Sequence, residues 1–124
     1  MTISNYLEDK LMDAVFNATS FGLVGDPYVS LHTADPGETG ASEAAGGSYA
    51  RVQAAFGASS GGAVANTGNI DFAGMPSTTI THVGIWDALA AGNALWSGAL
   101  AASKVVNAGD TFRIPTGDLD VTLD

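Results

Sequence analysis

The chain has 124 residues and carries four lysines and arginines against thirteen aspartates and glutamates, a formal net charge of −9. This length corresponds most simply to a single domain over residues 1–124 that forms its core without covalent cross-links. The absence of cysteine excludes disulfides, thiolate catalysis and cysteine-based zinc sites. The acidic balance argues against nucleic-acid binding, because phosphate backbones are held by clustered lysines and arginines.

The N-terminal sequence MTISNYLEDKL lacks the basic start and apolar run of a signal peptide. No apolar run in the chain approaches the roughly 20 residues that a membrane span needs. We therefore expect a protein that is made in the cytoplasm, is not secreted and contacts no membrane. Charged residues make up only 14% of the chain, a low share that suits close packing against other copies or partners.

The first predicted element is an amphipathic helix over about residues 5–19. Asn5 and Glu8 have the spacing of a capping box, in which each side chain satisfies a backbone amide of the first turn. Leu7, Leu11 and Val15 then form one apolar stripe. Because this stripe is wide enough to dock on a sheet, the helix is the first candidate to cover one face of the central hairpin described below.

After the helix, short apolar runs alternate with glycine and proline turns, which is the pattern of an antiparallel sheet. Strands are predicted at residues 28–33, 49–56, 63–72, 111–115 and 119–123, in addition to the central hairpin. Residues 37–47 contain only glycine, alanine, serine, threonine and glutamate, so they predict an exposed, mobile loop. The turn at residues 116–118 would join the last two strands as a hairpin with Arg113 opposite Asp120.

The central element is a β-hairpin over residues 80–100, in which Trp86 and Trp96 flank a loop that ends in Gly-Asn. Both faces of its first strand are apolar, with Val83 on one side and His82 and Trp86 on the other. A half-solvated strand would carry polar residues on one face. We expect one face to lie in the core and the other to lie under the helix or in a contact between subunits.

Together these elements predict a mainly β fold, an antiparallel sandwich or barrel of about seven or eight short strands with one N-terminal α-helix. The hairpin and the helix supply the side chains expected at contacts between chains. The predicted interface residues are Trp86, Trp96, Leu7, Leu11, Val15 and His82. Replacing either tryptophan with alanine is expected to weaken self-association or attachment to a larger assembly.

Candidate catalytic and metal-binding patterns favour structural interpretations. The segment GASSG at residues 57–61 matches G-x-S-x-G, but a nucleophile elbow requires a helix directly after the serine, and here two glycines and strand-like sequence follow Ser59. His32 and His82 could bind a metal with an aspartate, yet hydrogen bonding within a sheet is the simpler role for each. We predict no catalytic, cofactor-binding or metal site, and no enzyme.

The segments SNYLEDKLMD, YVSLHTADPG, GGSYARV, THVGIWDA and VNAGDTFRIPTGDLDVTLD together resemble a family of small virion proteins of tailed bacteriophages. Members of this family are described variously as tail-fibre-like, minor tail or minor capsid (decoration) proteins. The resemblance extends from about Ser4 to Asp124. It implies a structural protein located in the virion, with the major capsid protein or tail proteins as partners, and we expect a homo-oligomer, with a trimer as the favoured symmetry.

Two functions follow from this resemblance. The favoured one is a capsid decoration (cement) protein that binds the outer surface of the head and stabilises it, because the chain is small and has no fibrous repeat. The alternative is a tail or tail-fibre component in host-surface adhesion, with residues 37–47 and 57–62 as recognition loops. Those loops contain no aromatic residue for stacking on sugars, which favours decoration. The number of copies in each virion distinguishes the two.

Overall fold

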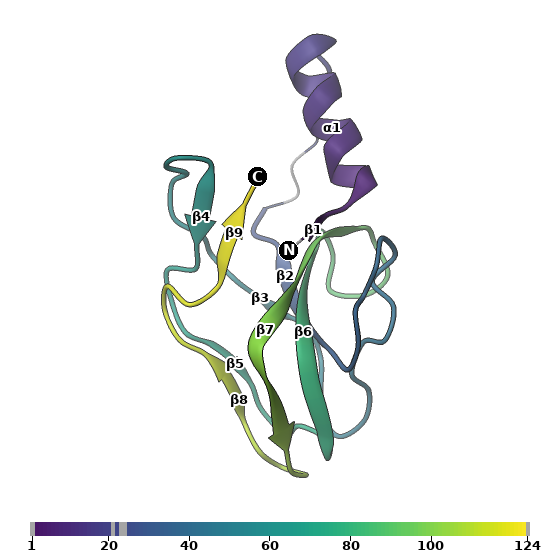
Figure 1. Ribbon diagram of the computed structural model, residues 1–124, viewed down its shortest axis with the longest axis vertical. Coiled ribbons are helices and arrows are strands. Elements are labelled where there is room, and N and C mark those ends of the chain that lie inside the picture. The colour runs from purple at the N-terminus through teal and green to yellow at the C-terminus, as the bar shows by residue number, and fades with distance from the viewer. Residues whose placement is uncertain (1, 21, 23–24, 124) are drawn as a thin grey trace.

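The computed structural model describes residues 2–20, 22 and 25–123, and it shows an antiparallel β-sandwich with one helix at one end (Figure 1). The prediction of a mainly β fold with an N-terminal helix is confirmed, and the sheets form an open sandwich rather than a closed barrel. The elements are β1 (Thr2–Ile3), α1 (Asn5–Phe16), β2 (Tyr28–His32), β3 (Val52–Gln53), β4 (Ala63–Ala65), β5 (Ile70–Phe72), β6 (Thr78–Trp86), β7 (Ala94–Val106), β8 (Phe112–Ile114) and β9 (Asp120–Thr122).

The first layer is a five-stranded sheet in the order β1-β7-β6-β2-β3. The predicted central hairpin is confirmed, since β6 and β7 pair along most of their length. Two register shifts interrupt this pairing, one between Ile85 and Trp86 and a larger one between Ile80 and His82. Ile80 pairs with Lys104 and His82 with Ala99, so the four residues 100–103 of β7 lie opposite Thr81 alone.

The second layer consists of two short pairs, β4 with β9 and β5 with β8. The expected hairpin of the last two strands is wrong, because Arg113 lies opposite Asp71 of β5 and not opposite Asp120. Side chains of the 66–69 segment cause this arrangement. Asn69 accepts from the backbone amide of Thr116 (3.0 Å), so the connection runs along β4 and β5 instead of folding back (Figure 1).

The core lies between the two layers and is filled by strand residues whose side chains point inward. Alternate positions of β2, β5, β6 and β8 supply most of them. The buried apolar cluster comprises Val29, Leu31, Ala44, Ala54, Ile70, Phe72, Met75, Ile80, Val83, Ile85, Trp96, Val106, Phe112, Ile114 and Leu119. This core occupies one face of the central hairpin, as predicted.

Helix α1 extends away from the sandwich instead of covering it (Figure 1). None of its residues is buried, so the helix, the first candidate to cover the hairpin, does not cover it. The helix is also shorter than predicted and is capped by Ser4, whose hydroxyl accepts from the amide of Leu7 (3.3 Å), rather than by Asn5. Within the described residues, no helix is long and apolar enough to cross a membrane.

The second face of the hairpin is covered by residues 33–47, which we call the covering loop. Its end pairs with the edge of β2, because Ala44 donates to the carbonyl of Leu31 (2.8 Å), and Pro36 and Ala44 are buried. Gly40 lies against the indole of Trp86, where a larger residue would collide with the ring. Most of residues 37–47 are exposed, as predicted, and their mobility stays a prediction, but the loop packs on the sheet at Gly40 and Ala44. Small residues let this backbone approach the sheet closely, so no large apolar side chain is needed to hold it.

Candidate functional site

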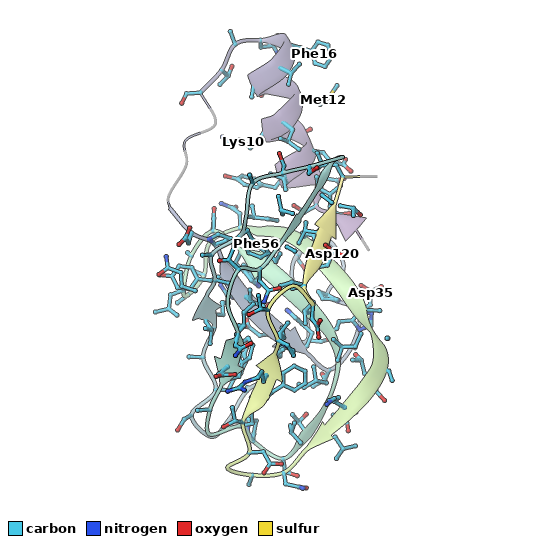
Figure 2. The ribbon with its side chains drawn as sticks, turned by 90° about the vertical axis from the view of Figure 1, so that its left-hand side faces the viewer. Lys10, Met12, Phe16, Asp35, Phe56 and Asp120 are labelled. Carbon is cyan, nitrogen blue, oxygen red and sulfur yellow. The ribbon has the colours of Figure 1, made fainter. Side chains whose placement is uncertain are left out.

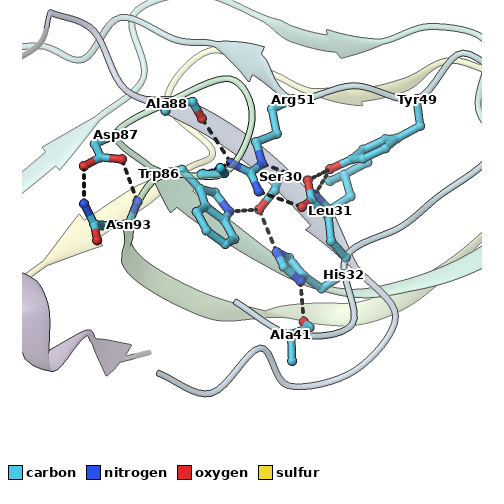
Figure 3. A network of polar contacts seen from close by, with 12 residues as sticks. Ser30, Leu31, His32, Ala41, Tyr49, Arg51, Trp86, Asp87, Ala88 and Asn93 are labelled. Atoms are coloured by element: carbon cyan, nitrogen blue, oxygen red, sulfur yellow. Dashed lines mark hydrogen bonds and ion pairs between the residues drawn. The ribbon is translucent and has the colours of Figure 1, made fainter. Parts of the chain in front are cut away.

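Polar side chains of β2 and β6 form a hydrogen-bonded chain beneath the covering loop (Figure 3). Ser30 and His32 alternate with the core residues of β2 and therefore point to the second face of the sheet. The indole N–H of Trp86 donates to Ser30 Oγ (2.9 Å), which lies 2.6 Å from His32 Nε2. His32 Nδ1 lies 2.8 Å from the carbonyl oxygen of Ala41. Because a carbonyl can only accept, Nδ1 carries the proton and Nε2 accepts from the hydroxyl of Ser30.

An ion pair extends this chain of contacts toward the hairpin loop. Arg51 holds Glu43 through two bonds, Nε to Oε2 (3.0 Å) and one terminal nitrogen to Oε1 (2.9 Å). Its guanidinium carbon lies 3.6 Å from the centre of the Trp86 ring, a cation–π contact. The other terminal nitrogen donates to the carbonyls of Ala88 (3.1 Å) and Ala91 (2.9 Å). Arg51 therefore ties the covering loop to the hairpin loop.

Tyr49 completes the arrangement from the core side. Its hydroxyl donates to Glu43 (2.8 Å) and accepts from the backbone amide of Leu31 (3.0 Å), while its ring stacks on Phe72. We refer to the connected side chains as the Trp86 network. Its members are Ser30, His32, Glu43, Tyr49, Arg51 and Trp86.

Burial sets the protonation states in the Trp86 network. Burial lowers the pKa of His32 below its ordinary value, and this effect outweighs the opposing bond to Ala41, so the imidazole is neutral. Burial alone would raise the pKa of Glu43, but the bonds from Arg51 and Tyr49 hold it below its ordinary value. Burial, together with the neighbouring carboxylate of Glu43, raises the pKa of the Tyr49 phenol above its usual range. The ion pair is thus charged and the rest of the network neutral.

The Ser30–His32 pair has the distance of a nucleophile and its base, but its surroundings leave no room for a substrate. Both residues are fully buried, and the cavity beside them measures about 10 Å³. A side chain at Gly84 would lie 2.7 Å from Ser30 Oγ and 2.8 Å from His32 Nε2, so only glycine fits there. The imidazole is oriented by a carbonyl rather than a carboxylate. We conclude that the pair holds the covering loop to the sheet.

The six predicted interface residues do not form one surface. Trp86 and Trp96 are only 7% and 5% exposed, and they lie on opposite faces of the sheet, one in the Trp86 network and one in the core. Replacing either with alanine would remove packing within the fold, so these variants cannot isolate an interface. His82 is half-buried beside Thr81, with 2.8 Å between its Nδ1 and the threonine hydroxyl.

The helix residues of the predicted interface differ in exposure. Leu7 and Leu11 are half-buried, whereas Val15 is 73% exposed. Met12 and Phe16, 58% and 72% exposed, extend the apolar surface along α1, and Figure 2 shows both side chains well clear of the sandwich. We call Met12, Val15 and Phe16 the open face of α1. An interface role for the six residues stays a prediction. Of these residues, Val15 belongs to the open face of α1, which is accessible to a partner.

The structure also shows the surroundings of Ser59 and of the possible metal ligands. Ser59 is exposed beside the turn that joins residues 60 and 63, which agrees with its interpretation as part of a glycine-rich turn. In the described part of the chain, no group of three or more histidine, aspartate or glutamate side chains could hold a metal ion.

A groove of about 610 Å³ opens between β7 and the β8–β9 segment. Its floor is apolar and includes Val83, Trp96, Phe112 and Leu119. The indole nitrogen of Trp96 is buried and has no hydrogen-bond partner in the part of the chain that the structure describes. A buried donor without an acceptor costs about 1–3 kcal/mol. Among the described residues, the open face of α1 is exposed apolar surface, whereas the floor residues of this groove are only 4–6% exposed.

The family of the chain follows from a comparison with known protein families. Residues 2–122 match the family described as Podophage GP4 fiber I protein gp80. The chain belongs to this family. The resemblance to structural virion proteins of tailed phages is confirmed, and the family is described as a fibre protein. No curated protein matches the chain.

Sequence reasoning missed the Trp86 network because its members are far apart in the chain. Glu43 lies in a predicted loop, and Tyr49 and Arg51 lie in a predicted strand, but neither pattern indicates a contact with Trp86, which only the fold creates.

Proposed function

We propose that this protein is a structural component of the tail-fibre apparatus of a podophage, with a mechanical rather than a catalytic role. The family match over residues 2–122 carries this proposal, because the family is described as a fibre protein. The same description favours the fibre over the capsid decoration that the sequence alone favoured. We further propose that the protein is made in the host cytoplasm and is incorporated into the virion there.

We propose that α1 attaches the protein to a neighbouring chain of the fibre. A 12-residue helix is about 18 Å long, and isolated helices of this length are marginally stable in water. The open face of α1 gains stability only when another surface covers it. Glu8, Asp9 and Asp13 border this face, and the chain as a whole carries a charge of −9. The best-matched partner is therefore an apolar surface with basic residues at its rim, such as another tail protein.

The base of α1 is fixed to the sandwich, which suits an attachment element. Ser4 donates through its hydroxyl to the carbonyl of Ala94 (2.6 Å) and through its amide to that of Leu95 (2.9 Å). The carboxylate of Glu38, from the covering loop, accepts from the amide of Asn5 (2.7 Å), where the helix dipole favours a negative charge. The helix therefore leaves the sheet in a direction set by both β7 and the covering loop.

Locating and counting the protein in purified virions tests the fibre assignment. Quantitative mass spectrometry against the major capsid protein, together with a cryo-EM map, should give a small number of copies located at the tail. Hundreds of copies spread over the head would contradict the proposal and support capsid decoration. Self-association, with a trimer as the expected state, stays a separate proposal that light scattering of the isolated protein tests.

A further inference from the structure

The groove between β7 and the β8–β9 segment is bordered by strand edges that are not paired. Beyond Ser97, the outer edge of β7 has no strand partner in the described structure, because β1 pairs only with Trp96 and Ser97. On the other side of the groove, β8 pairs only with β5 and β9 only with β4. Figure 2 looks onto this side, with β8 and β9 in front and β7 beside them. Free backbone donors and acceptors therefore border an apolar floor.

Such a groove differs from a pocket for a small molecule. Unpaired strand edges are templates for another strand, since their N–H and C=O groups have the spacing of a β-ladder. The groove is lined by Val83, Phe112 and Leu119, which are 4–6% exposed, and by the half-buried Leu100. Alternate side chains of an extended segment would pack against this lining. The exposed part of β7, residues 99–105, contains no proline and only one charge, Lys104. Residues 100–103 of this edge form the bulge opposite Thr81, so a pairing segment has to follow a bent edge.

The two ends of the groove carry opposite charges, which favours one orientation of a bound segment. Lys104 lies near the C-terminal end of β7, and no carboxylate in the described residues forms an ion pair with it. The neighbouring Arg113 is already bonded to Asp71 (2.7 Å). Asp118 and Asp120 also line the groove, and Asp120 begins β9, which lies farther from the C-terminal end of β7 than β8 does (Figure 1). An occupant antiparallel to β7 would match these charges with an acidic residue near its N-terminus and a basic residue near its C-terminus.

We propose that this groove is an acceptor site for an extended segment of another protein chain, which adds to β7 as an antiparallel strand. The segment would place apolar side chains on the floor at every second position, with an acidic residue at the Lys104 end and a basic residue at the Asp118–Asp120 end. Trp96 forms part of the groove lining, with its indole nitrogen buried. This inference depends on the geometry of the groove and holds whether the protein lies on the fibre or on the head.

Two synthetic peptides that differ only in their terminal charges test the proposal. The first, EVTVTVTK with blocked ends, matches the groove in the antiparallel direction, and KVTVTVTE reverses the charges. We expect the first peptide to bind saturably to ¹⁵N-labelled protein and to slow amide hydrogen exchange in residues 99–105 by about tenfold or more. The charge-reversed peptide should bind about tenfold more weakly.

Two variants on the same strand locate the binding. Leu100→Lys places a charge in the groove and should abolish peptide binding, while Val105→Lys changes an exposed residue that does not line the groove and should preserve it. Circular dichroism checks that both variants fold, and the comparison of the two peptides on the unaltered protein needs no variant. If the first peptide fails to bind, or binds without protecting the amides of β7, the proposal is wrong. Entry of a small apolar dye alone would identify the groove as a small-molecule pocket instead.

Discussion

The second face of the central sheet and the open face of α1 show opposite relations between polarity and burial. The sheet face carries the polar side chains of Ser30 and His32, yet both are fully buried by the chain itself. The helix face carries methionine, valine and phenylalanine, yet Val15 and Phe16 are more than 70% exposed. A polar surface is covered because its groups bond one another, and an apolar surface stays open because no other part of the described chain reaches it.

This difference separates the part of the protein that stabilises the fold from the part available for assembly. The Trp86 network satisfies each of its polar groups within the chain, so it offers little to a partner. The open face of α1 and the groove beside β7 gain only from a partner. We therefore expect substitutions in the network to change stability and substitutions on α1 to change assembly.

The largest expected effect comes from removing the cation of the network. Arg51→Ala leaves Glu43 partly buried with Tyr49 as its remaining partner, and loss of one member of a buried ion pair costs about 3–5 kcal/mol. Urea denaturation should show this loss in the free energy of unfolding. Arg113→Ala, which breaks an exposed pair with Asp71, is the matched control and should leave the midpoint close to that of the unaltered protein. Equal effects of the two substitutions would show that the network does not stabilise the covered face.

A methyl group at Gly40 should also separate the covering loop from the sheet. Its Cβ would collide with the indole of Trp86, and Gly40 has a φ of +76° that disfavours alanine. We expect Gly40→Ala to cost about 2–4 kcal/mol, the sum of overpacking and backbone strain. Gly37→Ala, in the same loop at a φ of +60° with nothing within 4 Å, should cost only about 1 kcal/mol. Thermal denaturation of both variants measures the difference, and similar losses would mean that the loop does not press on Trp86.

The smallest of the stability effects is a pH dependence that arises from His32. Its folded-state pKa is lowered from the ordinary value of 6.5, so the unfolded chain takes up a proton that the folded protein does not. Stability should be fully present above pH 6.5 and fall as the pH drops toward the lowered pKa of His32. The charged and titratable groups around it are Glu43, Arg51 and His82.

Two observations distinguish the contribution of His32. His32→Gln should flatten the pH dependence of the free energy of unfolding below pH 6.5, whereas His82→Gln should preserve it. The contribution of Glu43 falls in a separate range, because its lowered pKa gives stability that is present above its ordinary value of 4.5 and is lost at lower pH. An unchanged slope in His32→Gln would show that the imidazole is not buried in its neutral form.

The sequence predicted the elements that have a local pattern. The alternation in β6 and β2, and the turn between the tryptophans, sufficed for the central hairpin and for the mainly β class. The predictions that failed all depend on contacts between residues that are far apart in the sequence. Periodicity gives the apolar stripe of α1 but not the surface against which it packs, and Ser4 acts as the cap because it is also bonded to Ala94.

The covering loop shows what composition alone could not predict. A run of small residues without large apolar side chains is typical of a mobile loop, but here those small residues allow contact with Trp86 and with the edge of β2. Likewise, Thr116 and Asn69 are far apart in the sequence, and their contact sends the last strand to β4 rather than to β8. The candidate surfaces depend on such contacts, so only the apolar stripe of α1 could be predicted.

The central claim, that the open face of α1 serves assembly and not folding, is tested most directly by two valines of nearly equal exposure. Val15 of α1 is 73% exposed and Val105 of β7 is 74% exposed. The measurement is the amount of each serine variant in purified virions, relative to the major capsid protein. We expect both variants to fold, and Val15→Ser to be incorporated at least about tenfold less than Val105→Ser, because burying a valine at an interface contributes about 1.5–3 kcal/mol. Equal incorporation of the two variants would contradict the claim.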